Sequence, residues 1–496
     1  MVGAPGRSGR CDTCRRRKKG CDLKRPSCGT CTKSGLICAG YEREMKFINY
    51  DTKSSNSIRA QKRTARSPTV FSLPKTCEQS AFSTLLRNVF LDFYLTASFR
   101  SATASGTESD DWLRYVPDLP SSPAISSALE ALGAARISMS TKDAAMRNCS
   151  VHLYSKALLE TQKLVGQSAG DYSLELLATV MLLGLYEIYG YSENRCLGWT
   201  SHVNATRLLI QHMPKNDATS SLETTLSFGY RNNRIINAIG RRKSIFLENA
   251  VTANLAVGTD PVHEILQIMA QLPAYMEAAD ELRDNVSLFG DVKQVQCFID
   301  QTHKLINELE AWQRERVLST QDKLHIERAS HLSFLLSISP SKAHIGKLSG
   351  NFLFPDSATA YSQILYWTAL LLIYSNHWTA LATFETPYKP RQAEQGVPQF
   401  GDFSSQELDV YNRAYTCARN IAKSLDHFLG PEVAGNGASL IALPITVAMG
   451  FFQYWNLPEN SWCEAILIHL REVCGIPLDD FLDSCNSSES LVLVRI

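Results

Sequence analysis

The chain has 496 residues, of which 44% are hydrophobic and 20% are charged. This composition excludes a disordered protein and is typical of a folded chain with more than one domain. The net charge of +1 hides an asymmetry, because residues 1–66 hold 17 Lys and Arg against 5 Asp and Glu, a net charge of +12 that leaves −11 for the rest. The cationic segment indicates a polyanionic partner such as nucleic acid, a preference that the body does not share.

Six cysteines near the N-terminus follow the spacing C-x2-C-x6-C-x6-C-x2-C-x6-C. They are Cys11, Cys14, Cys21, Cys28, Cys31 and Cys38. The first three and the last three have the same internal spacing, so the segment repeats one half-site. Structural zinc takes four ligands in a tetrahedron, and C-x2-C is a common chelating spacing. Six thiolates complete two tetrahedra only if two of them bridge, so the spacing predicts two Zn²⁺ ions bridged by two of the six cysteines.

Two alternatives to zinc fit this segment less well. A framework of three disulfides needs an oxidising compartment, whereas the opening MVGAPGRSGR holds no apolar run typical of a secretory signal. An iron–sulfur site uses different cysteine spacings. The other eight cysteines are scattered without metal-ligand spacing, which indicates reduced residues of an intracellular protein.

Residues 11–38, CDTCRRRKKGCDLKRPSCGTCTKSGLIC, resemble the fungal two-zinc, six-cysteine (Zn(2)-C6 binuclear cluster) transcription factors. Arg15, Lys18, Asp22 and Pro26 match this family in addition to the cysteines, whereas Gly20 stands where the family usually carries a cation. The resemblance implies a zinc-dependent, sequence-specific regulator of RNA polymerase II transcription in the nucleus, acting on a metabolic or secondary-metabolite gene set. Its implied partners are double-stranded DNA and the transcription machinery.

Five consecutive cations, Arg15 to Lys19, follow the second cysteine. Modules of this family place a short helix in the major groove, where guanine offers the acceptors N7 and O6. The resemblance implies that Lys18 reads CGG-like half-sites, with Arg17 and Lys19 as further base contacts. The expected phosphate contacts, which position the module without reading sequence, are Arg15, Arg16, Lys24 and Arg25.

The chain is expected to be mostly α and to divide into four parts. These are a disordered basic N-terminus at 1–10, the zinc-cluster DNA-binding module at 11–38, a flexible linker at 39–78 and a large all-α regulatory domain at 79–496. The linker is polar and rich in Ser, Lys and Arg. No sustained heptad follows it, so a homodimer stays open; the apolar face that includes Phe82, Leu86 and Phe90 predicts a core helix instead.

Hydrophobic periodicity predicts helices through most of the body and no substantial sheet. After a helix starting at Ala124, they cover about 143–165, 173–190, 198–213, 261–284, 291–317, 320–338, 357–384, 405–429, 438–455 and 461–474. The longest uncharged stretch, 433–457, is interrupted by Pro444, Asn436 and Gln453, so we expect a buried helix and no membrane partner. The segments 90–95, 112–136, 176–189 and 198–214 are similar to the regulatory domain of many fungal transcription factors.

The sequence predicts that the chain is not an enzyme. Gly166–Gly170 matches G-x-S-x-G but follows a helical segment rather than a strand, and His263-Glu264 lacks the second histidine of HExxH because Gln267 stands there. The alternative is a small-molecule sensor or enzyme-like α-domain, with the zinc cluster as a subsidiary DNA tether. The segment Leu478–Asp483 fits either a short activation motif or a capped terminal helix.

Overall fold

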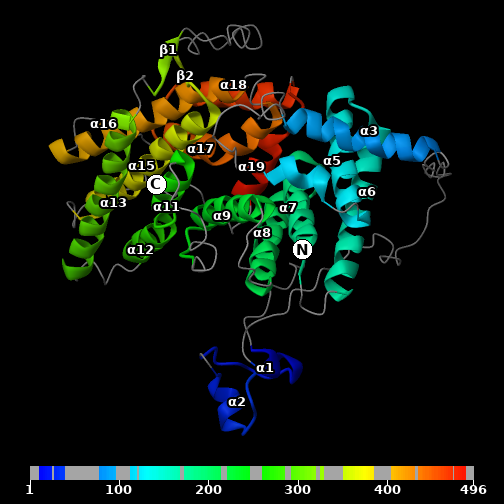
Figure 1. Cartoon of the computed structure of the whole chain (residues 1–496). Coiled ribbons are helices and arrows are strands. Elements are labelled where there is room, and N and C mark those ends of the chain that lie inside the picture. Colours follow the sequence, from blue (N-terminus) through cyan, green and yellow to red (C-terminus); the bar gives the residue numbers. More distant parts are fainter. Residues whose placement is uncertain are drawn as a thin grey trace, which may run out of the picture. The chain divides into compact units, whose positions relative to one another are not determined.

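The computed structural model divides the chain into two compact units, residues 1–70 and 71–496, which are described separately. The described residues are 11–24, 27–39, 77–95, 112–119, 122–167, 172–213, 221–245, 260–284, 292–319, 324–328, 350–384, 404–429, 434–472 and 474–487. The described residues of the first unit form two short helices, α1 (Asp12–Arg16) and α2 (Gly29–Lys33), which pack against each other (Figure 1).

The N-terminal part of the second unit, the body, is a group of helices around α5. Its elements are α3 (Cys77–Tyr94), the 3-10 helix η1 (Trp112–Asp118), α5 (Pro123–Thr141), α6 (Ala144–Gln167), α7 (Leu174–Tyr189), α8 (Arg195–His212) and α9 (Ser221–Arg241). The Ser122 hydroxyl accepts from the Ile125 N–H and Pro123 occupies the first turn, which fixes the start of α5. Helix α5 is buried along most of its length because α3, α6 and α7 all pack on it.

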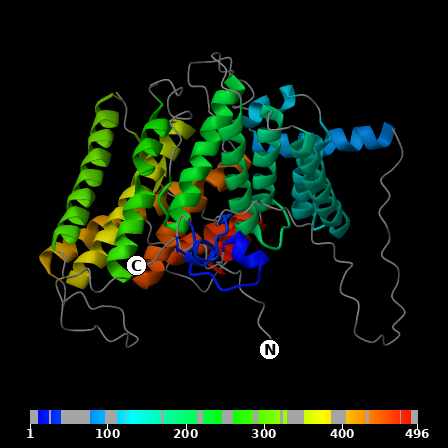
Figure 2. The ribbon, with the colours of Figure 1, turned by 90° about the horizontal axis from the view of Figure 1, so that it is seen from below.

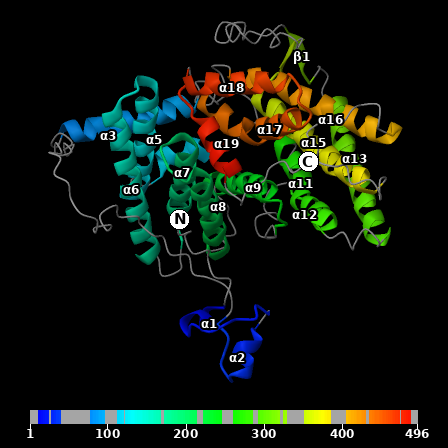
Figure 3. The ribbon, with the colours of Figure 1, turned by 180° about the vertical axis from the view of Figure 1, so that it is seen from behind.

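The C-terminal part of the body is built around α15. Its helices are α11 (Pro261–Met269), α12 (Leu272–Asp284), α13 (Val292–Ser319), α15 (Ser357–Phe384), α16 (Ser405–Ser424), η6 (Leu425–Leu429), α17 (Ala434–Tyr454), α18 (Asn460–Glu472) and α19 (Leu478–Ser487). Helix α15 contacts α11, α12, α13, α16 and α17, and its residues 360–374 are all buried. Helix α9 lies between the two groups and contacts α7 and α8 on one side and α11 and α12 on the other (Figures 1 and 3). Figure 2 shows the long helices of the body side by side.

The prediction of a mostly α fold is confirmed, with differences at three places. The single helix expected at 261–284 is two, because Pro273 lacks the N–H that a continuous helix would need. Helix α9 was not predicted, since its NNR segment and Gly229 have low helix propensity and burial in the body overrides this. The prediction of a helix at 320–338 is wrong for residues 326–328, which form the strand β1 (Ile326–Arg328). This strand pairs antiparallel with β2 (Asn351–Leu353), with Glu327 opposite Phe352.

Helix α17 contains the one stretch among the described residues that is long and apolar enough to span a membrane, Gly437–Tyr454, with a mean hydropathy of 1.4. Of this stretch, 61% is buried inside the body, where α17 packs against α15, α16 and α18. It therefore has the position of a core helix in this fold, as expected from the sequence.

Candidate metal centre and nucleic-acid interface

The fold of the first unit brings all six N-terminal cysteines together. Their sulfur atoms form two groups of four, and within each group all sulfurs lie within 4.8 Å of one another. One group is Cys11, Cys14, Cys21 and Cys28, and the other is Cys11, Cys28, Cys31 and Cys38. Cys11 and Cys28 belong to both groups, so they occupy the positions from which a thiolate can bridge two metal ions.

The sulfur–sulfur distances fit tetrahedral zinc. The Zn–S distance of about 2.3 Å gives a tetrahedron with edges of about 3.8 Å. Cys11 Sγ lies 3.5 Å from Cys28 Sγ and 3.8 Å from Cys31 Sγ, and Cys14 Sγ lies 3.6 Å from Cys28 Sγ. The donor set is all sulfur, which suits zinc. The residues present therefore fit two zinc ions.

Backbone N–H groups orient the two shared thiols in the same way. The Cys14 N–H donates to Cys11 Sγ at 3.4 Å, and the Cys31 N–H donates to Cys28 Sγ at 3.3 Å. These contacts are equivalent under the 17-residue offset between the half-sites, so the sequence repeat is also a structural one. Hydrogen bonds of this kind hold a metal-ligating side chain in one orientation.

The close packing of the cysteine thiols makes their ionisation unfavourable unless a cation is bound. Cys11, Cys14, Cys28 and Cys31 are fully buried, and burial raises the pKa of the Cys11, Cys14 and Cys28 thiols. A bound cation reverses this effect, since a coordinating thiol is deprotonated. Zinc binding is therefore coupled to the folding of this small unit.

Two hydrogen-bonded contacts join the half-sites outside the thiol cluster. The Gly29 N–H at the start of α2 donates to the Asp22 carboxylate, 2.9 Å to Oδ1 and 3.0 Å to Oδ2. The Ala39 N–H donates to Thr13 Oγ1 at 2.9 Å, and Thr13 Oγ1 donates to the Ile37 carbonyl at 3.2 Å. Sequence reasoning assigned no role to Thr13 or Gly29. No pattern in the sequence signals these contacts, because each joins residues that only the fold of the two half-sites brings together.

Both short helices end in the same type of cap. The Lys19 N–H donates to the Cys14 carbonyl and the Leu36 N–H to the Cys31 carbonyl, each at 3.0 Å. This cap requires a left-handed residue one position earlier. In the second half-site that residue is Gly35, with φ 65°, and in the first it is Lys18, with φ 54°. A lysine therefore stands where glycine is conformationally favoured.

The cationic side chains of the first half-site face solvent where the structure describes them. Arg16, Arg17, Lys18, Lys19 and Lys24 are exposed. The helix ends after Arg16, so Lys18 and Lys19 lie on the turn that follows it rather than on the helix. The side chain of Arg15 and all of Arg25 and Pro26 lie outside the described residues.

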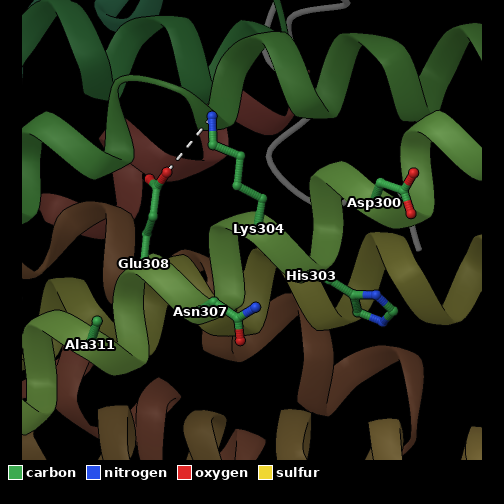
Figure 4. Close-up of a pocket in the computed structure, with 6 residues that line it drawn as sticks. All are labelled: Asp300, His303, Lys304, Asn307, Glu308 and Ala311. Atoms are coloured by element: carbon green, nitrogen blue, oxygen red, sulfur yellow. Dashed lines mark ion pairs between the residues drawn. The ribbon is translucent and has the colours of Figure 1, made fainter.

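The body carries a separate hollow with a volume of about 560 Å³ on α13. It is lined by Asp300, His303, Lys304, Asn307, Glu308 and Ala311. All six residues belong to one helix, and Lys304 pairs with Glu308 at 3.8 Å (Figure 4). A ligand or active site normally has polar groups that converge from several elements, and this hollow lacks that arrangement.

The motifs that matched enzyme patterns have structural roles among the described residues. Gly166 and Gln167 end helix α6, and residues 168–170 lie outside the described residues. His263 and Glu264 lie in the first turn of α11, which Asp260 caps and Pro261 begins. Glu264 accepts from Trp312 Nε1 at 2.9 Å, which ties α11 to α13.

A six-thiol metal centre with an exposed cationic turn, joined in one chain to a large helical body, defines a metal-dependent nucleic-acid-binding regulator. Residues 10–46 match the model of the fungal Zn(2)-Cys(6) binuclear cluster domain, which binds two zinc ions. Residues 89–241 match the fungal specific transcription factor domain, a range that begins within α3 and ends at the last residue of α9. The chain thus carries both domains of fungal DNA-binding transcription factors. No curated protein and no solved structure matches it.

Proposed function

We propose that the chain is a nuclear, sequence-specific regulator of RNA polymerase II transcription that reads CGG-like half-sites through Lys18. The observation that carries this proposal is the left-handed backbone of Lys18 at the end of α1, where the equivalent residue of the other half-site is Gly35. A non-glycine residue in this conformation costs about 1–2 kcal/mol. Strained residues of this kind cluster at functional sites. The lysine at this position places an exposed cationic side chain on the turn, which supports a role in DNA binding.

The other cations divide into two sets in this proposal. Arg17 and Lys19 flank Lys18 on the same turn and are assigned to the base edges. Arg15, Arg16, Lys24 and Arg25 are assigned to phosphates, which position the module without specifying sequence. The metal ligands are the six cysteines, with Cys11 and Cys28 as the bridging pair because they belong to both groups of four sulfurs.

The body is proposed to regulate the DNA-binding module for a metabolic or secondary-metabolite gene set. The partners in this proposal are double-stranded DNA, the transcription machinery and, on paired half-sites, a second copy of the chain. The competing interpretation, a sensor or enzyme-like body, predicts convergent polar groups in a cavity. The hollow on α13 does not support it, because one helix supplies all its lining residues.

A binding titration with the full chain tests this function. Fluorescence anisotropy would compare a labelled duplex that contains CGG with a scrambled duplex of equal length at the same salt concentration. Lys18→Gly should weaken binding to the CGG duplex by about 1–3 kcal/mol and leave the scrambled duplex nearly unchanged. Arg16→Gln is the matched control, because loss of a phosphate contact should weaken both duplexes equally. Equal loss on both duplexes for Lys18→Gly would contradict the role of Lys18.

A further inference from the structure

Three polar side chains meet in the interior of the body, on α6, α7 and α8. The Tyr154 hydroxyl donates a hydrogen bond to Glu187 Oε1 and lies 3.1 Å from His202 Nε2. His202 Nε2 is 3.8 Å from Glu187 Oε1. Glu187 is 2% exposed and His202 is 6% exposed. We call these three residues the Glu187 cluster.

The backbone of α8 closes the cluster from one side. A Cβ atom at Gly198 would lie 2.3 Å from Glu187 Cδ, so any larger residue here would displace the carboxyl group from its present position. Glu187 Oε2 is buried and has no hydrogen-bond partner within normal distance among the residues that the structure describes, although the Ser192 side chain and the Arg195 charge both favour the ionised carboxyl group. An ionised carboxylate with one unpaired buried oxygen is unfavourable. Burial therefore favours the protonated form of the Glu187 carboxyl group.

Arg195, at the start of α8, connects the cluster to the last described helix, α19. Its guanidinium donates to the Pro477 carbonyl at 3.2 Å and pairs with Asp480 Oδ2 at 3.5 Å. Arg195 is 6% exposed and also interacts electrostatically with Glu187. Arg195 is therefore paired with Asp480 and is also attracted by a charge on Glu187.

The rest of α19 is held on α8 by neutral contacts. Phe481 packs edge-to-face on Trp199, with 5.9 Å between ring centroids. The Cys196 N–H donates to the Ser484 hydroxyl at 3.2 Å. These contacts do not titrate near neutral pH, so the Arg195–Asp480 pair is the part of this interface that a charge on Glu187 can alter.

We propose that Glu187, held in place by Tyr154 and next to a neutral His202, is a proton switch that sets how firmly Arg195 holds α19 on the body. With Glu187 protonated, Arg195 pairs with Asp480 and donates hydrogen bonds to the Pro477 and Ser192 carbonyls. When Glu187 releases its proton, the new carboxylate draws the guanidinium inward and weakens its hold on α19. The proposal concerns the body alone and does not depend on the DNA-binding function.

The ionisation of the surrounding groups agrees with this switch. Burial raises the pKa of Glu187 to about 7 and lowers the pKa of His202 to about 4, so near neutral pH the carboxyl group titrates while the imidazole is neutral. Burial also raises the pKa of Tyr154 and of Tyr186, which stacks on it, so both hydroxyls keep their protons. The other groups that act on the switch are Tyr191 in the loop before α8, Asp480 on α19 and Arg471 on α18.

Hydrogen–deuterium exchange of the full chain, read by mass spectrometry, tests the switch. Protection of residues 478–487, corrected for intrinsic exchange, should fall about fivefold between about pH 6 and about pH 8. Protection of α15 serves as the internal reference and should not change. Glu187→Gln should abolish the pH dependence and keep the protection measured at low pH. Arg195→Met should give low protection at both pH values.

Glu130→Gln is the matched control, because Glu130 is also a buried carboxyl group with a raised pKa, but it lies on α5 and the charges that act on it are Arg87 and Lys156 rather than Arg195. It should keep the pH dependence of the wild-type chain. Arg195→Lys provides a second variant that retains the charge, and it should show a pH dependence in the same direction. The proposal is overturned if Glu187→Gln responds to pH as the wild type does, or if α15 loses protection in parallel with α19.

Discussion

The carboxylate of Asp22 accepts the N–H of Gly29, so the residue after the third cysteine caps the helix that follows the fourth. A Cβ atom at Gly29 would lie 2.5 Å from Asp22 Oδ2, which explains the glycine at this position. A second contact joins the half-sites through Thr13, whose Oγ1 accepts from the Ala39 N–H. The two half-sites are thus joined by sulfur in the centre and by hydrogen bonds at both edges.

Removal of the Asp22 cap should loosen the metal centre. Asp22→Ala is expected to destabilise the module by about 1 kcal/mol, since it removes a charge-assisted hydrogen bond at an exposed site. Zinc transfer to a chromogenic chelator would show this as faster release. Asp22→Asn keeps an acceptor oxygen, so its rate of zinc release should lie between those of the wild type and Asp22→Ala. A release rate for Asp22→Ala equal to that of the wild type would contradict the prediction.

The shared thiols should matter more for metal content than the others. Cys28→Ala removes a ligand from both groups of four sulfurs, so we expect loss of both zinc ions. Cys21→Ala removes a ligand from one group only, and one ion should remain bound. Native mass spectrometry of the full chain gives the stoichiometry directly. Retention of two ions by Cys28→Ala would rule out the bridging role of this cysteine.

The two helix caps should respond in opposite ways to substitution. Gly35→Ala forces a side chain into the left-handed region and should cost about 1 kcal/mol of module stability. Lys18→Gly places glycine at the equivalent position and should keep or raise this stability. Chelator concentration at half-release, measured without DNA, separates this backbone effect from loss of DNA binding. A destabilised Lys18→Gly module would mean that the lysine side chain has a structural role.

Glu187 and His202 should have opposite effects on how the free energy of unfolding of the body depends on pH. The folded pKa of Glu187 lies above its ordinary value of 4.5, so its contribution to stability is lost as pH rises from about 4.5 to about 7. The folded pKa of His202 lies below its ordinary value of 6.5, so its contribution is lost as pH falls from about 6.5 to about 4. Between these limits the two slopes, each about 1 kcal/mol per pH unit, cancel in the wild type.

Single substitutions should reveal each slope. Relative to the wild type, Glu187→Gln should gain stability as pH rises from about 5 to about 6, and His202→Gln should lose it. Urea unfolding of the body, followed by circular dichroism, gives the free energy of unfolding at each pH. If the free energy of unfolding of both variants changes with pH as that of the wild type does, neither group titrates in this pH range.

A buried arginine clamp should hold the two helix groups of the body together. Arg242, at the end of α9, donates to both carboxylate oxygens of Asp280 on α12, at 2.7 and 2.8 Å, and to Asn376 on α15 at 2.6 Å. Arg242→Leu leaves the Asp280 charge partly unpaired and should cost about 3–5 kcal/mol. Arg231, also buried on α9, has an Nε atom without a partner among the described residues. Arg231→Leu is therefore the matched control, and calorimetry should find it nearly neutral.

The sequence by itself determined the metal centre, because cysteine spacing along a short chain limits which sulfurs can share an ion. It also determined most helices, whose hydrophobic periodicity directly reflects a buried face. Tertiary structure alone decided the roles of Thr13, Gly29 and Glu187, since each depends on contact with residues distant in sequence. It also decided α9 and the strand Ile326–Arg328, where burial and pairing with Asn351–Leu353 outweigh local propensity. For Lys18 both sources are needed. The sequence repeat aligns Lys18 with Gly35, and only the fold shows that both residues adopt the left-handed conformation.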